Sequence, residues 1–249
     1  MTADPNRPDG WRGRIGLIIP SSNRLSEPQL TRHAPPGVQI HTTRLRMTGQ
    51  YHAPPLETLE HIRGAAALLA DAKVNLILFH CTANSMEGGP GADQTIADAI
   101  REATGVPATT TATAILAALR ALEMRRFVLL SPYSDETNAH EVRFLEGNGF
   151  EVRAAHGLNL PSSDAYISYP PAEWYARTLE RRDARADGYF LSCTNIRAFE
   201  IIEGLEAALG KPVVASNQAS LWHALRLIGV PDAVPGLGRL LAAPSAVPA

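Results

Sequence analysis

Short apolar segments alternate with longer segments of helical spacing along most of the chain. The continuous apolar runs have the length and composition of buried parallel strands. The alternating or shorter β-branched runs are also expected to be strands, and glycines just beyond several helical segments are typical helix ends. The expected strands are 15–19, 38–45, 74–79, 106–110, 127–130, 150–155, 188–191 and 213–216. The expected helices are 27–31, 56–72, 92–104, 112–122, 136–147, 172–183, 197–209 and 219–228. This order predicts an α/β fold with parallel sheets and right-handed crossovers.

The pattern is repeated in the second half of the chain. Ile15 and Phe127 open the two lead strands, 112 positions apart, and Cys81 and Cys193 are separated by the same 112 positions. Segment 112–122 also resembles segment 218–228, at an offset of 106. The chain therefore reads as two pseudo-symmetric Rossmann-like lobes, each a parallel sheet flanked by helices. Ligands of such sheets bind beyond the carboxyl ends of the strands, so we expect an active site in the cleft between the lobes.

The repeat also sets the expected domain boundaries. The first lobe is expected to span residues 14–111 and the second 112–217, with segment 218–241 packing back on the first lobe. Residues 1–13 read as a flexible tail and 242–249 as a frayed end. Residues 158–171 and 48–55 read as loops, and residues 84–91 as a glycine-rich loop that lacks the lysine of a phosphate-binding loop.

Composition narrows the class of protein. Of 249 residues, 45% are apolar, which is enough for a full core, and the net charge of −2 does not favour nucleic-acid binding. No apolar run approaches the roughly 18 residues of a membrane span, and the polar, proline-rich start does not resemble a signal peptide. We therefore expect a cytoplasmic protein with no membrane partner. The histidines and two cysteines show no metal-ligand spacing and no disulfide framework, so no metal is expected.

The two cysteines are the candidate chemical groups. Each ends an apolar strand and is followed by threonine, as Cys81-Thr82 and Cys193-Thr194. A single cysteine at a strand end is usually a small buried side chain, but two at one repeat offset favour a functional pair. A cysteine just before a helix N-terminus is poised to ionise to the nucleophilic thiolate. Both would meet that condition if the helices after Gly91 and Asn195 pointed at the cleft.

Several segments resemble the Asp/Glu racemase superfamily, and within it the branch of maleate cis–trans isomerases and arylmalonate decarboxylases. They are Ile15–Asn23, Cys81-Thr82, Arg101–Thr110, Ser131–Tyr133 with Asn138, Leu191–Thr194 and Pro212–Ser216. The resemblance covers residues 14–241. It implies two α/β lobes around one active site, no metal or organic cofactor, and a small dicarboxylate substrate. Members are often oligomeric, so a homo-oligomer is compatible with the resemblance.

At several positions this chain departs from the patterns of the racemases and decarboxylases, and these positions distinguish among the possible reactions. Amino-acid racemases usually carry an acidic residue where this chain has Ser21 and Ser22, and a histidine where it has Thr194-Asn195. Decarboxylases have a glycine in place of Cys81 and Thr-Ser after it, whereas this chain has Thr82-Ala83. The presence of Cys81 favours the two-thiol isomerase pattern.

The resemblance implies a role for each candidate residue in a maleate-type isomerase. Cys81 adds to the alkene, the new single bond rotates, and Cys193 delivers or removes the proton. The expected substrate-binding residues, which hold the carboxylates, are Ser21, Asn23, Thr82, Tyr133 and Thr194. Asn138 is expected to support Tyr133 from behind. The alternatives are a racemase, which would use both thiols as acid and base, a decarboxylase, which needs Cys193 alone, and a non-catalytic carboxylate-binding protein.

Substrate choice is expected to depend on two loops, 46–55 and 158–169. Tyr166 and Tyr169 in the second loop could close over the site or pack the loop against its lobe. His80 precedes Cys81 on a strand, so its side chain should point away from the cleft, and we interpret it as structural.

Overall fold

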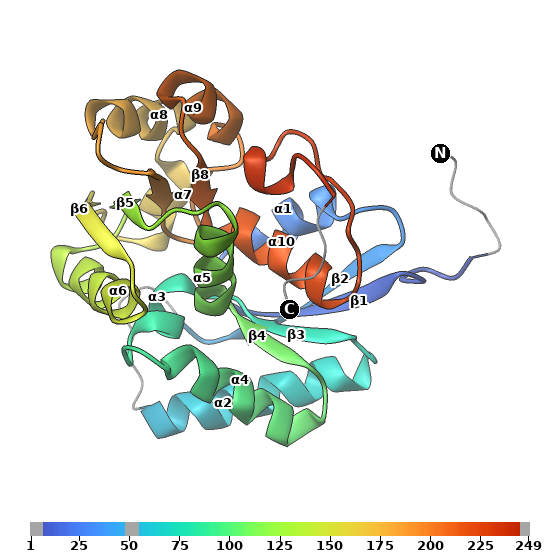
Figure 1. Cartoon of the computed structure of the whole chain (residues 1–249). Helices are drawn as coiled ribbons and strands as arrows, with labels where there is room; N and C mark the ends of the chain where they lie inside the picture. The colour runs from blue at the N-terminus through green and yellow to red at the C-terminus, as the bar shows by residue number, and fades with distance from the viewer. Residues whose placement is uncertain (1–6, 48–54, 245–249) are drawn as a thin grey trace.

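Two four-stranded parallel sheets organise the chain in the computed structural model, which describes residues 7–47 and 55–244. The first sheet has the order β2-β1-β3-β4, with β1 (Gly13–Pro20), β2 (Val38–Leu45), β3 (Leu76–Phe79) and β4 (Ala108–Thr110). The second has the order β6-β5-β7-β8, with β5 (Arg126–Ser131), β6 (Glu151–Gly157), β7 (Gly188–Leu191) and β8 (Val213–Ala215). The expected α/β fold with two sheets of equivalent order is confirmed (Figure 1).

The strand register reproduces the sequence repeat. Ile15 pairs with Leu76 in the first sheet and Phe127 with Gly188 in the second, so both partners are displaced by 112 positions. The last strands follow a smaller offset: Ala108 on β4 corresponds to Val213 on β8, 105 positions on. The sequence comparison placed this offset at 106. The difference arises because α10 (Ser216–Leu227) is one residue longer than α5 (Thr111–Ala121), so only the helix ends are 106 apart.

The helices cover the sheets in layers. The long helix α2 (Pro55–Asp71) and α4 (Ala92–Thr104) lie together on one face of the first sheet, and α5 and α10 pack against each other between the two sheets (Figure 1). The remaining longer helices are α1 (Ser26–His33), α6 (Asp135–Gly147), α8 (Pro171–Glu180) and α9 (Ile202–Leu209), and a short 3₁₀ helix lies at Arg239–Leu241. Helix α10 also contacts α1 and β3, which ties the end of the chain to the first sheet.

Alternation along β1 explains why this sheet is covered on both faces. Ile15, Leu17 and Ile19 point into the large core that includes residues of α5 and α10. Ile18 points the other way, into a smaller core with Ile62 and other residues of α2 and α4. Because successive side chains of a strand face opposite sides, a run of apolar residues needs an apolar layer on each face.

Three local expectations were wrong. A short helix, α3 (Thr82–Met86), begins directly after Cys81 and takes in the first residues of the loop expected at 84–91. A second, α7 (Ser163–Ser168), lies in the expected loop at 158–171, and the Ser162 hydroxyl caps it by accepting the Ala165 N–H at 3.2 Å. Conversely, α9 begins at Ile202 and not at Arg197, because the chain before it forms a turn closed by the Ile201 N–H on the Ala198 carbonyl at 3.0 Å.

The described part of the N-terminal segment is attached to the segment that follows α10. Arg12 forms a two-pronged ion pair with Asp232, in which one bond measures 2.7 Å. The domain boundaries stay predictions, and residues 1–6, 48–54 and 245–249, including most of the loop 46–55, lie outside the described residues. Among the helices that the structure describes, none is both long enough and apolar enough to cross a membrane.

Candidate active site

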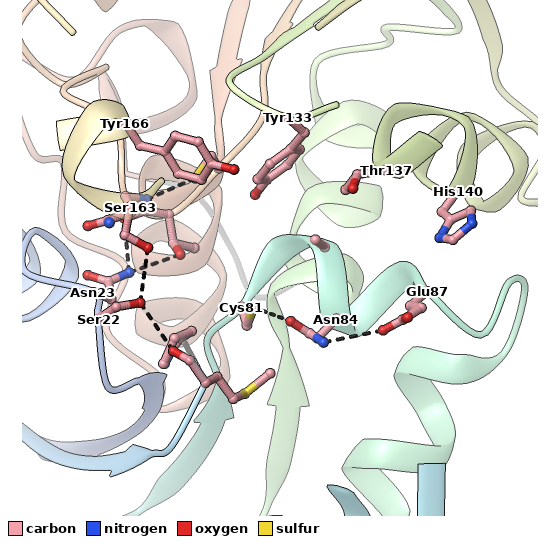
Figure 2. Close-up of a pocket in the computed structure, with 16 residues that line it drawn as sticks. Ser22, Asn23, Cys81, Asn84, Glu87, Tyr133, Thr137, His140, Ser163 and Tyr166 are labelled. Carbon is pink, nitrogen blue, oxygen red and sulfur yellow. Dashed lines mark hydrogen bonds between the residues drawn. The ribbon is translucent and has the colours of Figure 1, made fainter. Parts of the chain in front are cut away.

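A small cavity of about 100 Å³ lies where the carboxyl ends of strands from both sheets meet. Its walls come from turns and short helices of both halves of the chain, as expected for parallel sheets. Figure 2 shows Tyr133 and Tyr166 opposite Cys81 and Asn84. The lining residues are Pro20, Ser22, Asn23, Met47, Cys81, Ala83, Asn84, Glu87, Tyr133, Thr137, His140, Ser163, Tyr166, Cys193, Thr194 and Asn195.

Both cysteines reach this cavity from equivalent positions. Cys81 follows β3 and Cys193 follows β7, each the third strand in its sheet order. Their side chains are almost enclosed, at 8% and 5% exposure, and neither forms a disulfide. The two sulfurs are close enough for the charge of Cys81 to raise the pKa of Cys193. The pair that the repeat predicted is thus brought into one cavity.

The backbone at Cys193 is strained. Its φ is +124°, a region that residues other than glycine rarely adopt. The surroundings hold it there, since the Cys193 N–H donates to the Ser216 hydroxyl at 3.1 Å and the sulfur accepts the Asn195 N–H at 3.3 Å. Strain of this kind costs on the order of 1–3 kcal/mol and is concentrated at functional sites.

Burial keeps both thiols protonated, which corrects the expectation that they are poised to ionise. It raises the pKa of Cys81 to about 12, although the backbone N–H of Asn84 lowers it. It also raises the pKa of Cys193 to about 12, against the opposing hydrogen bonds of Tyr133 and the Asn195 N–H. No helix directly follows Cys193, because α9 starts only at Ile202, and desolvation of a buried thiolate outweighs the nearby N–H donors.

Asn23 and Thr194 meet at the cavity wall. The Asn23 amide donates to the Thr194 hydroxyl at 3.0 Å and to the Ser26 hydroxyl at 2.9 Å, while its oxygen accepts the Leu25 and Ser26 N–H groups. The structure therefore brings both expected carboxylate ligands to the cavity. In this arrangement, however, the Asn23 amide is engaged by protein groups, so a ligand would have to compete for its donors.

Tyr133 stands beside Cys193, and Asn138 lies behind it. The Tyr133 hydroxyl interacts with the Cys193 sulfur, and burial raises its own pKa well above the usual value. The Ser131 hydroxyl donates to Asn138 Oδ1 at 2.6 Å and accepts the Tyr133 N–H at 3.1 Å. Asn138 is thus connected to the backbone of Tyr133 through Ser131, and its supporting role stays a prediction.

Two expected ligands lie outside the cavity lining. Ser21 is exposed, and its hydroxyl lies near the Met47 carbonyl, because the Ser21 N–H is tied to Leu45 at 2.7 Å. Its neighbour Ser22 faces the cavity instead. Thr82 is fully buried in α3, and its hydroxyl has no hydrogen-bond partner among the described residues. The turn after β1 and the helix after Cys81 rotate these two side chains away.

Polar residues on α3 and α6 were missed. The Cys81 thiol donates to Asn84 Oδ1 at 3.0 Å, and the Asn84 amide donates to Glu87 at 3.3 Å (Figure 2). Thr137 and His140 line the same wall. Asn84 and Glu87 are three positions apart, as are Thr137 and His140, and this spacing places two residues on one face of a helix. A helix predicted after Cys81 would therefore have indicated Asn84 and Glu87.

Helix α7 forms one side of the cavity. The Ser163 hydroxyl donates to the Ser22 hydroxyl at 3.0 Å, which joins α7 to the first sheet (Figure 2). Tyr166 packs edge-on against Tyr133, with ring centroids 5.9 Å apart. Tyr169 packs instead against Trp174, at 5.3 Å, and is not among the lining residues. Of the two tyrosines in this segment, Tyr166 therefore covers the site and Tyr169 anchors its own lobe.

His80 points away from the cavity. Its ring lies between the Thr111 hydroxyl and Asn217 Oδ1, each at 3.0 Å. Burial lowers its pKa to about 4, so it is neutral. Across the part of the chain that the structure describes, no group of three histidine, cysteine, aspartate or glutamate side chains is arranged to hold a metal ion.

Comparison with known proteins identifies the family. The profile of the family described as arylmalonate decarboxylase matches residues 15–241. The chain is 32% identical over 249 residues to the maleate isomerase of Nocardia farcinica (strain IFM 10152), covering 95% of this chain and 98% of that protein.

Comparison with solved structures also finds maleate isomerases. A cysteine-to-alanine variant of the maleate isomerase of Pseudomonas putida S16, with maleate, superposes with a TM-score of 0.86 at 25% identity, covering 93% of this chain and 98% of the other. A cysteine-to-serine mutant of the Nocardia farcinica maleate cis–trans isomerase, with a covalently bound succinylcysteine intermediate, gives 0.87 at 27% identity, over 92% and 98%. With two parallel sheets, a cysteine from each in one cavity, and a profile match over residues 15–241, the chain belongs to the arylmalonate decarboxylase family and within it is similar to maleate isomerases.

Proposed function

We propose that this protein is a maleate cis–trans isomerase, with Cys81 as the nucleophile and Cys193 as the acid–base group. The observation that carries the proposal is the convergence of both sulfurs on one small, nearly enclosed cavity. The similarity to maleate isomerases over 95% of the chain supports it, as does the succinylcysteine adduct described for one of them. A decarboxylase of the kind described above needs only the second thiol, so the retained Cys81 favours isomerisation.

The reaction can be balanced with the two thiols alone. The Cys81 sulfur bonds to one alkene carbon, the π electrons move to the neighbouring carbon and its carboxylate, and the Cys81 proton leaves. Cys193 gives its proton to that neighbouring carbon and takes up the proton from Cys81, so a thiol has been added across the double bond. After rotation about the new single bond the steps reverse: the carbon–sulfur bond breaks, Cys193 gives its proton to the departing Cys81 sulfur, and Cys193 takes the proton from the neighbouring carbon. The product is fumarate, and both thiols are restored.

The raised thiol pKa values fit this sequence. A thiol with a pKa of about 12 is a poor nucleophile at neutral pH, so proton transfer must accompany its attack. The negative charge that develops on the substrate carboxylate needs hydrogen-bond donors. We propose that Asn23, Tyr133 and Thr194, which line the cavity, supply them. Ser22 is a further donor in place of Ser21.

The proposal is tested by adding maleate to the purified protein and following the proton NMR spectrum for fumarate. Wild-type protein should form fumarate, whereas Cys81→Ser and Cys193→Ser should lose most turnover while keeping the wild-type circular-dichroism spectrum. Absence of fumarate at high enzyme concentration would contradict the proposal. Release of CO₂ from phenylmalonate by Cys81→Ser would instead indicate a decarboxylase that uses Cys193 alone. A cytoplasmic location and a homo-oligomer stay predictions.

A further inference from the structure

Glu141 is a carboxyl group that the fold buries behind the active site. It lies on α6 and is completely inaccessible to solvent. Its Oε1 accepts a hydrogen bond from the Ser192 hydroxyl at 2.9 Å. Its Oε2 is buried and has no hydrogen-bond partner among the described residues. No lysine or arginine within the described part of the chain forms an ion pair with it.

An unpaired carboxylate in such a place is costly, so the neutral acid is favoured. Burial accordingly raises the pKa of Glu141 to about 8, and the Ser192 hydrogen bond, which lowers the pKa, only partly opposes this effect. The side chain is therefore neutral at pH 7 and ionises within a range in which enzyme activity can be measured.

The position of Glu141 links its charge to the reaction. Ser192, its hydrogen-bond partner, immediately precedes Cys193. When ionised, Glu141 also raises the pKa of Cys81, Tyr133 and Cys193, so it acts on groups on both sides of the cavity. A dicarboxylate bound between the two sulfurs would feel the same negative charge.

Other titratable groups lie near α6. Helix α6 packs against α3 and β6. On β6, Arg153 is paired with Glu151 and Asp183, and burial lowers the pKa of His156. Glu87 follows α3 and adds further negative charge beside Cys81. The other titratable residues of α6 are Asp135, Glu136, His140, Arg143 and Glu146.

We propose that Glu141 is a positioning and specificity residue: as a neutral acid it holds Ser192 beside Cys193 and allows the cavity to accept a dianion, and on ionisation it excludes that dianion. This inference rests on the proposed function, because it assumes a dicarboxylate in the cavity. The ionisation of this one buried side chain would then set the highest pH at which the substrate binds well.

The test measures maleate binding by calorimetry, and kcat and KM by NMR, between pH 7 and 9.5. In the wild-type protein, Kd and KM should rise roughly tenfold for each pH unit above the pKa of Glu141. Glu141→Gln, which stays neutral, should keep both constants within about twofold over the range. Ser192→Ala removes the hydrogen bond that favours the ionised form, so the rise should begin at a higher pH. Glu146→Gln, on the exposed side of the same helix, is the matched control and should behave as wild type.

The outcomes separate the two proposals. A wild-type alkaline rise that persists unchanged in Glu141→Gln, or flat wild-type constants across the range, overturns the role of Glu141. A purely structural role would alter stability without changing how KM depends on pH. Binding of maleate with the expected pH dependence but without fumarate formation overturns the isomerase proposal and supports Glu141 as a binding determinant. A protein that neither binds nor converts maleate overturns both.

Discussion

Asn23 donates a hydrogen bond to Thr194 at 3.0 Å across a separation of 171 positions, and so joins the turn after β1 to the turn after β7. The same amide group also donates to the Thr194 carbonyl at 3.3 Å. Because the two residues belong to different sheets, this contact holds both halves of the cavity at one spacing. Asn23 is thus a structural bridge as well as a candidate substrate ligand.

Replacing Asn23 by alanine should reduce both stability and substrate binding. The substitution removes the hydrogen bonds of Asn23 to the buried Thr194 hydroxyl and to the Ser26 N–H, which should lower the free energy of unfolding by about 2–3 kcal/mol. Urea unfolding measures the first effect, and the KM for maleate, expected to rise at least tenfold, measures the second. Asn23→Asp keeps the acceptor but removes the donors, so it should retain more stability than alanine and bind the dianion no better. Unchanged unfolding of Asn23→Ala would contradict the bridging role.

The two thiols should make the protein sensitive to alkali. Their pKa values are raised from 9.0 to about 12, so above pH 9 the unfolded chain loses protons that the folded protein keeps. Stability must then fall as the pH rises from about 9 towards 12. The melting temperature measured between pH 8 and 11 should show this decline, and it should be shallower in Cys81→Ser and in Cys193→Ser. Melting curves that shift in parallel with wild type at every pH would argue against buried neutral thiols.

Buried histidines should cause the opposite trend in acid. Burial lowers the pKa of both His80 and His223 from 6.5 to about 4, so between these values the unfolded chain binds protons that the folded protein does not. Stability should therefore fall as the pH decreases from 6.5 to 4. His223, whose Nδ1 has no partner in the described chain, can be replaced by phenylalanine to weaken this acid dependence. His61→Gln, at an exposed position on α2, should leave the dependence unchanged. Equal acid sensitivity of the two variants would count against this explanation.

Substitutions in and just after α7 should separate substrate binding from packing. Ser163→Ala removes the hydrogen bond to Ser22, and Tyr166→Ala removes the ring that covers Tyr133, so each should raise KM by about three- to tenfold. Tyr169→Ala loses its packing on Trp174 and should lower the unfolding free energy while leaving KM near the wild-type value. Steady-state kinetics and urea unfolding on the same preparations make the comparison. A larger KM effect at Tyr169 than at Tyr166 would reverse the assignment.

Much of the fold was predictable because its signals are local. Apolar runs such as the one from Ile15 mark strands buried on both faces, and glycine after a helical segment marks its end. Failures occurred where the local signal was weak or was overridden. Helix α3 has only five residues and α7 only six, too short for a hydrophobic period, and the expected start of α9 was displaced by the turn at Ala198–Ile201.

The candidate site also has features that the sequence predicted and features that only tertiary packing decided. Hydrophobic periodicity and the offset of 112 positions sufficed to pair Cys81 with Cys193, because equivalent positions of a duplicated unit have equivalent places in their sheets. Tertiary packing decided how acidic these thiols are, that Ser22 and not Ser21 lines the cavity, and that Glu141 is buried behind the active site. Such properties depend on desolvation and on contacts between residues far apart in the chain. They arise only when the two sheets pack together and exclude water from the space between them.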